Sequence, residues 1–260
     1  MAVFILATLF CVTLIFALNV KYAGMDSGAI LMVFGNALDH GHGPGNSSLS
    51  LEKLLSYIMS GIAITIFFVS LFLSLFSVSS VYPEMLKKGY IDMLISKPIS
   101  RTYVFFQRFC GAMTAVFINI FYIVIFSWLI LSFKFGVWDL SFLISGFVVL
   151  LFFYNIFSMM IMISMFVKNS VIALLSTYFI VFILSPIIAA VERFGAEERS
   201  LVSLVSGFLN GILPKISETV IFINLLLTGD ELTAIIPVGS ILSGTLFLLV
   251  AVSVFTRTDF

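Results

Sequence analysis

The run Ile58–Val81, which reads IMSGIAITIFFVSLFLSLFSVSSV, decides the fold of this chain. It carries no charged residue, and it is longer than the roughly 20 apolar residues that a helix needs to cross the hydrocarbon layer of a bilayer. A polar segment, residues 82–102, follows it, and a second long apolar run covers residues 105–133. This alternation of long apolar runs and short polar segments predicts a helical membrane protein.

The composition of the whole chain points the same way. Hydrophobic residues make up 61% of the 260 residues and charged residues 10%, with a mean hydropathy of +1.22. A soluble domain carries about 25% charged residues. This small number of charged residues cannot cover the surface of a water-soluble fold of this size. We therefore expect that lipid surrounds most of the chain. The formal net charge is zero, which gives no indication of a nucleic-acid partner.

Six apolar runs have the length of a membrane span, and none has a charge near its centre. They cover roughly residues 2–19, 58–81, 105–133, 141–167, 170–190 and 234–255. The first run lacks a preceding basic region, so we interpret it as a retained helix, with a cleaved signal peptide as the alternative. The sequence therefore predicts an all-α integral membrane protein, with six transmembrane helices in a single transmembrane domain over residues 1–260.

The distribution of basic residues predicts that both termini are cytoplasmic in a multi-pass protein of the cell membrane. Short predicted inner segments are dense in lysine and arginine, as cytoplasmic loops are, whereas the predicted outer loops, about 20–57 and 191–233, are long. Residues 201–212 have helical spacing and predict an interfacial helix in the outer loop before span six. A seven-span alternative, with the C-terminus outside, would make residues 201–227 a further span.

Residues 82–102 are predicted to form a short cytoplasmic helix between spans two and three. Pro83 suits the first helical position, Glu84 complements the helix dipole, and Pro98 ends the helix. Ser100 or Thr102 can cap the next helix. An apolar stripe runs through Leu86, Tyr90, Met93 and Leu94. The segment is either a lever held by two membrane helices or a basic topology determinant whose stripe rests on the bilayer.

Residues 84–111 resemble the first cytoplasmic loop of ABC transporter permeases of the type-2 exporter class (the ABC-2 family). Those loops carry an acid, then Lys-Gly, then a Leu-Leu-Ser-x-Pro-x-Ser-Arg core, then a basic residue and a glycine. The matching residues are Glu84, Lys88-Gly89, Leu94-Ile95-Ser96-Lys97-Pro98-Ile99-Ser100-Arg101, Arg108 and Gly111, and residues 255–260 resemble the family's C-terminal ending. The family usually begins with a basic amphipathic helix, whereas this chain starts directly with the apolar residues 2–6.

The resemblance implies a membrane subunit that is not itself an enzyme. In such permeases this loop is a coupling helix that docks on a separate ABC ATPase subunit, which binds the ATP, and the permease pairs with a second copy or with a sister permease. The resemblance assigns docking and transmission of motion to Glu84, Lys88, Gly89, Asp92, Leu94, Lys97, Pro98 and Arg101.

The sequence offers little for other chemistry. It has no phosphate loop of the Gly-x-x-x-x-Gly-Lys-Ser/Thr type, so we expect no bound ATP and no other cofactor on this chain. His40 and His42, beside Asp39, are weak metal candidates because a site normally takes three or four fixed ligands. Cys11 and Cys110 both lie in apolar runs and are expected to be buried hydrophobes, not a disulfide or a metal pair.

Three polar residues inside the predicted spans are candidates for a substrate path, namely Asn119, Tyr154 and Asn155. The alternative role for them is hydrogen bonding between helices. Pro186 is expected to kink span five. A stand-alone secondary transporter or channel is the alternative function, but such carriers place ionisable residues within spans. An intramembrane enzyme or a structural membrane protein is a third class, and no set of catalytic groups supports the enzyme.

The predicted topology can be tested at Lys87. A membrane-impermeant amine reagent added to intact cells should leave Lys87 unmodified, because the segment is predicted to face the cytoplasm, and should modify Lys53, which is predicted to lie outside. Peptide mass spectrometry before and after permeabilisation measures both sites. Modification of Lys87 in intact cells would show that the lever faces the wrong side.

Overall fold

The computed structural model describes residues 18–22, 29–33, 36–37, 51–86, 100–136, 138–195, 211, 213–228 and 235–257. Within these residues, 5 stretches are long and apolar enough to cross a membrane, namely Ser56–Met85, Arg101–Phe133, Ser141–Val167, Ser170–Val191 and Val238–Arg257. They match the predicted spans two to six, which confirms a helical, multi-pass type of chain. The predicted first span and the interfacial helix at 201–212 lie almost entirely outside the described residues.

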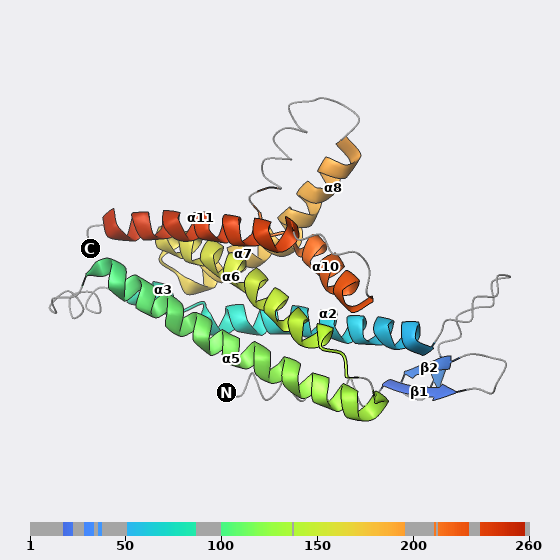
Figure 1. Cartoon of the computed structure of the whole chain (residues 1–260). Helices are drawn as coiled ribbons and strands as arrows, with labels where there is room; N and C mark the ends of the chain where they lie inside the picture. The colour runs from blue at the N-terminus through green and yellow to red at the C-terminus, as the bar shows by residue number, and fades with distance from the viewer. Residues whose placement is uncertain are drawn as a thin grey trace. The chain divides into compact units, whose positions relative to one another are not determined.

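The helices are named in chain order, as Figure 1 labels them. They are α2 (Leu51–Val78), α3 (Val81–Met85), α5 (Arg101–Phe135), α6 (Ser141–Val167), α7 (Ser170–Tyr178), the π-helix η1 (Phe179–Leu184), α8 (Ser185–Gly195), α10 (Ile216–Thr228) and α11 (Ile235–Arg257). Span two therefore comprises most of α2 together with α3, and span five comprises α7, η1 and part of α8.

A small antiparallel sheet precedes α2, in the order β1 (Leu18–Tyr22), β2 (Ala29–Val33) and β3 (Asn36–Ala37). Leu18 pairs with Val33 and Tyr22 with Ala29, while Val33 also pairs with Asn36. The prediction of an all-α fold did not anticipate these strands. β1 also begins at Leu18, inside the run 2–19 that was expected to form span one.

The described residues belong to two compact units. The first unit draws on the chain up to Ser70, on Asn119–Gly146 and on Ile223–Leu232, and the second on Leu71–Ile118, Phe147–Phe222 and Thr233–Phe260. The long helices α2, α5 and α6 each contribute to both units. The single domain expected over residues 1–260 therefore stays a prediction.

Helix α6 forms the centre of the second unit. Every residue from Asn155 to Ile161 is buried, which covers the full circumference of the helix. A helix that is apolar all round is enclosed by others. The neighbouring helices instead expose large apolar side chains on one side, as lipid-facing helices do; examples are Phe106 on α5, Leu175 on α7 and Leu249 on α11. Cys110 on α5 is also exposed, so its predicted burial was wrong.

Local capping explains why two spans meet in a turn of only two residues between α6 and α7. Lys168 adopts φ 56° and ends α6, and its amide donates to the carbonyl of Ser164 at 2.9 Å. Asn169 then caps α7, because its Oδ1 accepts from the amides of Val171 and Ile172 at 3.0 and 3.4 Å. These hydrogen bonds pair backbone amides of the turn, for which lipid tails offer no hydrogen-bond partner.

The turn between α5 and α6, in the first unit, has the aromatic composition of a membrane interface. Gly136 adopts φ 72° just after α5, and the Asp139 carboxylate accepts from the Ser141 amide at 2.8 Å. The indole of Trp128 donates to the Asp139 carbonyl at 2.8 Å, and its ring packs edge-on against Trp138 with centroids 5.3 Å apart. Tryptophan is enriched at this depth of a membrane protein.

Span five changes its helix type where the sequence predicts a kink. The π-helix η1 directly precedes Ser185 and Pro186. Proline removes one backbone hydrogen bond and its ring crowds the carbonyl four residues earlier, and the wider π-helical turn accommodates both. Ser185 Oγ donates to the Pro214 carbonyl at 2.7 Å, which fixes the start of α8. Figure 1 shows α8 rising away from the line of α11 in the same unit.

Helices α6 and α11 approach each other closely at Gly244. A Cβ atom at this position would lie 2.7 Å from Cε1 of Tyr154 and 3.1 Å from Cα of Asn155. Gly244→Ala should therefore lower the free energy of unfolding by about 1–3 kcal/mol, because the two helices must move apart. The measurement is thermal unfolding of the purified protein in detergent.

Gly111→Ala is the matched control for this prediction. No atom lies within 4 Å of the Cβ that this substitution adds, and Gly111 is on α5 in the same unit. Alanine there should be neutral or stabilising by up to about 1 kcal/mol, since it favours the helix. Equal effects at the two glycines would contradict the close approach.

Candidate functional site

The two ends of the predicted coupling segment lie within the described residues, and its middle does not. Glu84 is exposed on α3 and Arg101 is half-buried at the start of α5. The other six assigned residues are outside the described part of the chain: Lys88, Gly89, Asp92, Leu94, Lys97 and Pro98.

The local structure at both ends can be compared with the prediction. Helix α3 begins at Val81 and not at Pro83, so the predicted start was wrong by two residues. Pro83 still lies in the first turn, where backbone amides have no partner within the helix. On the other side, Ser100 Oγ accepts from the Tyr103 amide at 3.3 Å, which confirms the predicted cap of α5.

A buried aromatic cluster holds both ends of the segment. We define it as Tyr82, Phe105, Phe109, Phe157 and Phe255, which are all buried. Tyr82 packs against Phe105 and Phe157 with ring centroids 5.0 and 6.2 Å apart, and its hydroxyl donates to the Phe105 carbonyl at 3.1 Å. Phe157 stacks on Phe109 at 5.5 Å, and Phe105 packs against Phe255 at 5.6 Å.

The aromatic cluster joins four helices. Tyr82 comes from α3, Phe105 and Phe109 from α5, Phe157 from α6 and Phe255 from α11. Each aromatic pair contributes about 0.5–1.5 kcal/mol beyond its buried area. The segment between α3 and α5 is thus attached, through Tyr82 and Phe105, to helices that are distant from it in the chain.

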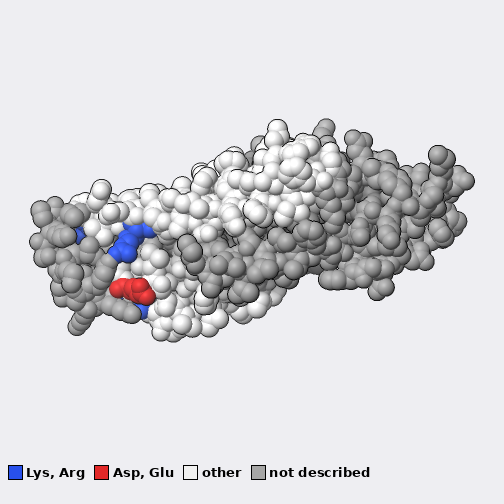
Figure 2. All heavy atoms as spheres, turned by 90° about the horizontal axis from the view of Figure 1, so that it is seen from below, with Lys and Arg blue, Asp and Glu red and all other residues white. Residues whose placement is uncertain are grey.

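Charged residues gather at this end of the second unit. Arg101 and Arg108 lie near the start of α5, Lys168 follows α6, and Arg257 ends α11. Figure 1 shows the start of α5 and the end of α11 at the same end of the unit. Figure 2 shows basic and acidic side chains near one end of the face that it presents, while the described remainder of that face is uncharged.

The length of α5 explains how it can carry two arginines. Arg101–Phe133 comprises 33 residues. A rise of 1.5 Å per residue makes this stretch about 50 Å long, against a hydrocarbon thickness of about 30 Å. The first turns of α5 therefore extend beyond the hydrocarbon layer or tilt to its edge, where arginine side chains are solvated.

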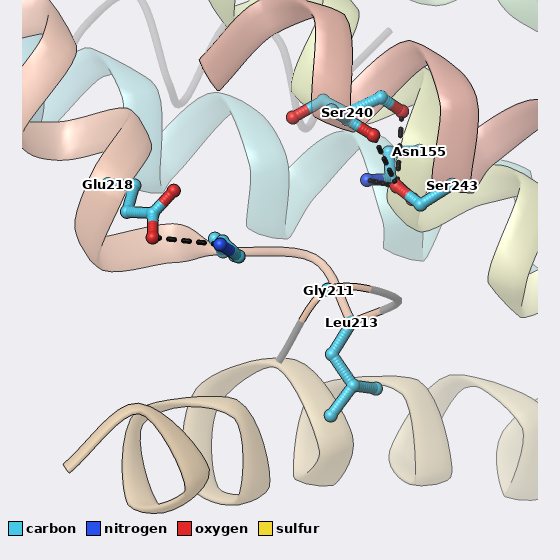
Figure 3. Close-up of a pocket in the computed structure, with 8 residues that line it drawn as sticks. Asn155, Gly211, Leu213, Glu218, Ser240 and Ser243 are labelled. Atoms are coloured by element: carbon cyan, nitrogen blue, oxygen red, sulfur yellow. Dashed lines mark hydrogen bonds and ion pairs between the residues drawn. The ribbon is translucent and has the colours of Figure 1, made fainter. Parts of the chain in front are cut away.

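A polar cavity of about 90 Å³ lies elsewhere in the second unit (Figure 3). Side chains from α6, α10, α11 and the loop before α10 line it. The lining residues are Asn155, Gly211, Leu213, Lys215, Glu218, Gly239, Ser240 and Ser243. Lys215 and Glu218 form an ion pair at 3.0 Å, and each side chain is about one-third exposed, which places the pair at the open side.

Asn155 is the buried polar group of this cavity, with 1% of its surface exposed. Its Nδ2 donates to Ser243 Oγ at 2.8 Å, and Ser243 Oγ in turn donates to the Gly239 carbonyl at 3.0 Å. Asn155 Oδ1 accepts no hydrogen bond from any residue that the structure describes. Asn155 Oδ1 is therefore an unsatisfied acceptor in the described lining of the cavity, in which Lys215 and Glu218 are the charged residues.

The three residues that were predicted to line a substrate path lie in different surroundings. Asn155 lines the cavity, whereas Tyr154 packs edge-on against Phe109, with ring centroids 5.9 Å apart, and faces Gly244. Asn119 is half-buried on α5 in the first unit. His40 and His42 lie outside the described residues, among which no group of three or more potential metal ligands occurs.

Sequence reasoning missed Ser240 and Ser243, although a signal was present. Gly239 and Ser243 are four residues apart, as are Ser240 and Gly244. Small residues at this spacing mark close helix packing in membranes. The pattern identifies the face of α11 that meets α6, and that face carries both serines of the cavity.

Comparison with known proteins adds no relative. No family model matches the chain, and neither a curated protein nor a solved structure was found to match it.

The aromatic cluster yields a prediction at Tyr82. Tyr82→Phe should lower the free energy of unfolding by about 1 kcal/mol, because it removes one hydrogen bond and keeps the ring. Tyr82→Ala should lower it by roughly 3–5 kcal/mol, because it leaves a cavity among buried rings. Denaturant titration in mixed micelles measures both values.

Tyr103→Ala is the control for these substitutions, since Tyr103 is on the same end of α5 but is 59% exposed. It should change the free energy of unfolding by less than about 0.5 kcal/mol. A Tyr82→Ala protein that is as stable as the Tyr103→Ala protein would contradict the role of the aromatic cluster.

Proposed function

We propose that this chain is the membrane-spanning permease subunit of an ATP-driven exporter of the ABC-2 type. In this proposal residues 82–102 dock on a separate ATPase subunit, and the chain itself binds no cofactor and catalyses no reaction. The permease works with a second copy or a sister permease in the cell membrane, with both termini in the cytoplasm.

The observation that carries the proposal is the attachment of both segment ends to one buried cluster. Tyr82 and Phe105 contact each other directly, and through Phe157 and Phe255 they contact α6 and α11. Protein interiors are close-packed and transmit strain. In this proposal a displacement of the segment is passed through the aromatic cluster to α5, α6 and α11 together.

The basic residues near the aromatic cluster, at one end of the second unit, support the proposal that this end faces the cytoplasm. Arg101, Arg108, Lys168 and Arg257 belong to the ends of α5, α6 and α11 that the topology assigns to the cytoplasm. Cytoplasmic segments carry an excess of basic residues. The proposed docking surface and the basic end of the second unit then coincide.

The proposal gives the cavity a role as part of the path. Polar groups in a membrane bundle are costly unless they are paired, so an unpaired one marks a functional position. Asn155 lies in the middle of α6, which also contributes Phe157 to the aromatic cluster. The residues beside the cavity and the residues beside the lever thus share one helix.

Docking can be tested with Leu94→Glu. Affinity purification of the wild-type chain from its native membranes should recover a protein with a Gly-x-x-x-x-Gly-Lys-Ser/Thr phosphate loop, identified by mass spectrometry. Leu94→Glu should reduce that recovery at least tenfold, because a charge replaces an apolar contact of the segment with its partner. Leu94→Met is the matched control and should retain the partner.

Two results would contradict the proposal. One is equal recovery of the phosphate-loop protein with Leu94→Glu and Leu94→Met. The other is recovery of no such protein with the wild-type chain, together with substrate transport by the reconstituted chain alone without ATP. Membrane insertion of each variant is checked by its extraction as a single species in size-exclusion chromatography.

A further inference from the structure

The unsatisfied oxygen of Asn155 identifies the kind of group that the cavity accepts. Asn155 is 1% exposed, so bulk water does not reach it freely, and its Oδ1 has no donor among the described residues. Buried polar groups are normally hydrogen-bonded, and each exception calls for an explanation. The cavity beside Asn155 has room for a partner.

The size of the cavity limits that partner. About 10–15 Å³ of such space holds one water, so a cavity of about 90 Å³ has room for a group of a few heavy atoms, such as a hydroxyethyl arm. The rest of a ligand would lie at the open side, beside Lys215 and Glu218.

The charges of the lining favour a neutral group. Lys215 and Glu218 neutralise each other at 3.0 Å, so the lining has no net charge. An ion that enters the cavity finds no net counter-charge in the described lining to replace the hydration that it loses. The open hydrogen-bonding position is a neutral amide oxygen, which requires a donor.

We propose that this cavity binds a neutral, hydroxyl-bearing arm of a ligand, with the hydroxyl donating to Asn155 Oδ1. An alcohol both donates and accepts, and the Lys215 ammonium supplies donors at the open side, since it has three N–H groups and gives one to Glu218. The inference deepens the proposed function, on which it rests for the meaning of the cavity as a substrate subsite. The binding itself does not depend on the ATPase.

A cysteine at Ser240 allows the preference to be measured without knowing the ligand. Ser240 lines the cavity, and Ser240→Cys is introduced into a Cys11→Ala, Cys110→Ala background. The probes are hydroxyethyl and propyl methanethiosulfonate, which match in size and differ in one hydroxyl. Each modification rate on the purified chain is divided by the rate of the same reagent with free cysteine.

The hydroxyethyl reagent should modify the Ser240→Cys protein about fivefold faster than the propyl reagent, the ratio that one net hydrogen bond of about 1 kcal/mol gives. Adding Asn155→Leu should reduce the ratio to about one. Adding Asn224→Leu, the same change at a residue of α10 that does not line the cavity, should leave it at about fivefold.

Several outcomes would overturn the inference. A ratio near one in the Ser240→Cys protein means that the cavity holds water only, and a faster propyl reagent means an apolar site. A faster aminoethyl or sulfonatoethyl reagent means that the site prefers a cation or an anion. The ratio of the Ser240→Cys protein decides the matter even where Asn155→Leu does not fold, and its failure leaves the Leu94 experiment unaffected.

Discussion

The packing of aromatic rings on Phe157 is the interaction on which the second unit depends. Phe157 stacks on Phe109 and Phe153 at 5.5 Å each and contacts Tyr82 at 6.2 Å. Lipid tails are as apolar as these side chains, so membrane helices gain little from hydrophobic burial alone and associate through close packing. Ring packing at this point therefore decides which ends of α3, α5 and α6 stay together.

Polar side chains in the apolar helices follow a consistent pattern. Many serines and threonines donate to a carbonyl three or four residues earlier on their own helix, as Ser158 and Thr177 do. Other polar side chains form hydrogen bonds with another segment of the chain. The Tyr178 hydroxyl, for example, donates to the Phe72 carbonyl at 2.6 Å. Three buried side-chain atoms have no hydrogen-bond partner among the described residues, namely Ser70 Oγ, Ser132 Oγ and Asn155 Oδ1. Of these residues Asn155 lines the cavity, and the proposed subsite follows from its open acceptor.

The proposed mechanism connects two features that lie far apart in the sequence. In this proposal residues 82–102 act as the lever, and the aromatic cluster joins Tyr82 and Phe105, on either side of the segment, to α6 and α11. Those two helices also provide Asn155 and Ser243 of the cavity. Because α6 and α11 pack closely against each other at Gly244, a movement of one helix is passed to the other.

The sequence by itself determined that the chain enters a membrane, where spans two to six lie, and that Ser100 caps α5, because apolar run length and local capping depend on neighbouring residues alone. Only the tertiary structure decided which polar residues meet. Asn155 and Tyr154 are adjacent in the sequence, yet one lines a cavity and the other packs against Phe109. These partners come from two other helices, Phe109 from α5 and, for Asn155, Ser243 from α11, 88 residues further on. Periodicity reports which face of a helix is apolar, but the neighbour of that face is set by long-range packing.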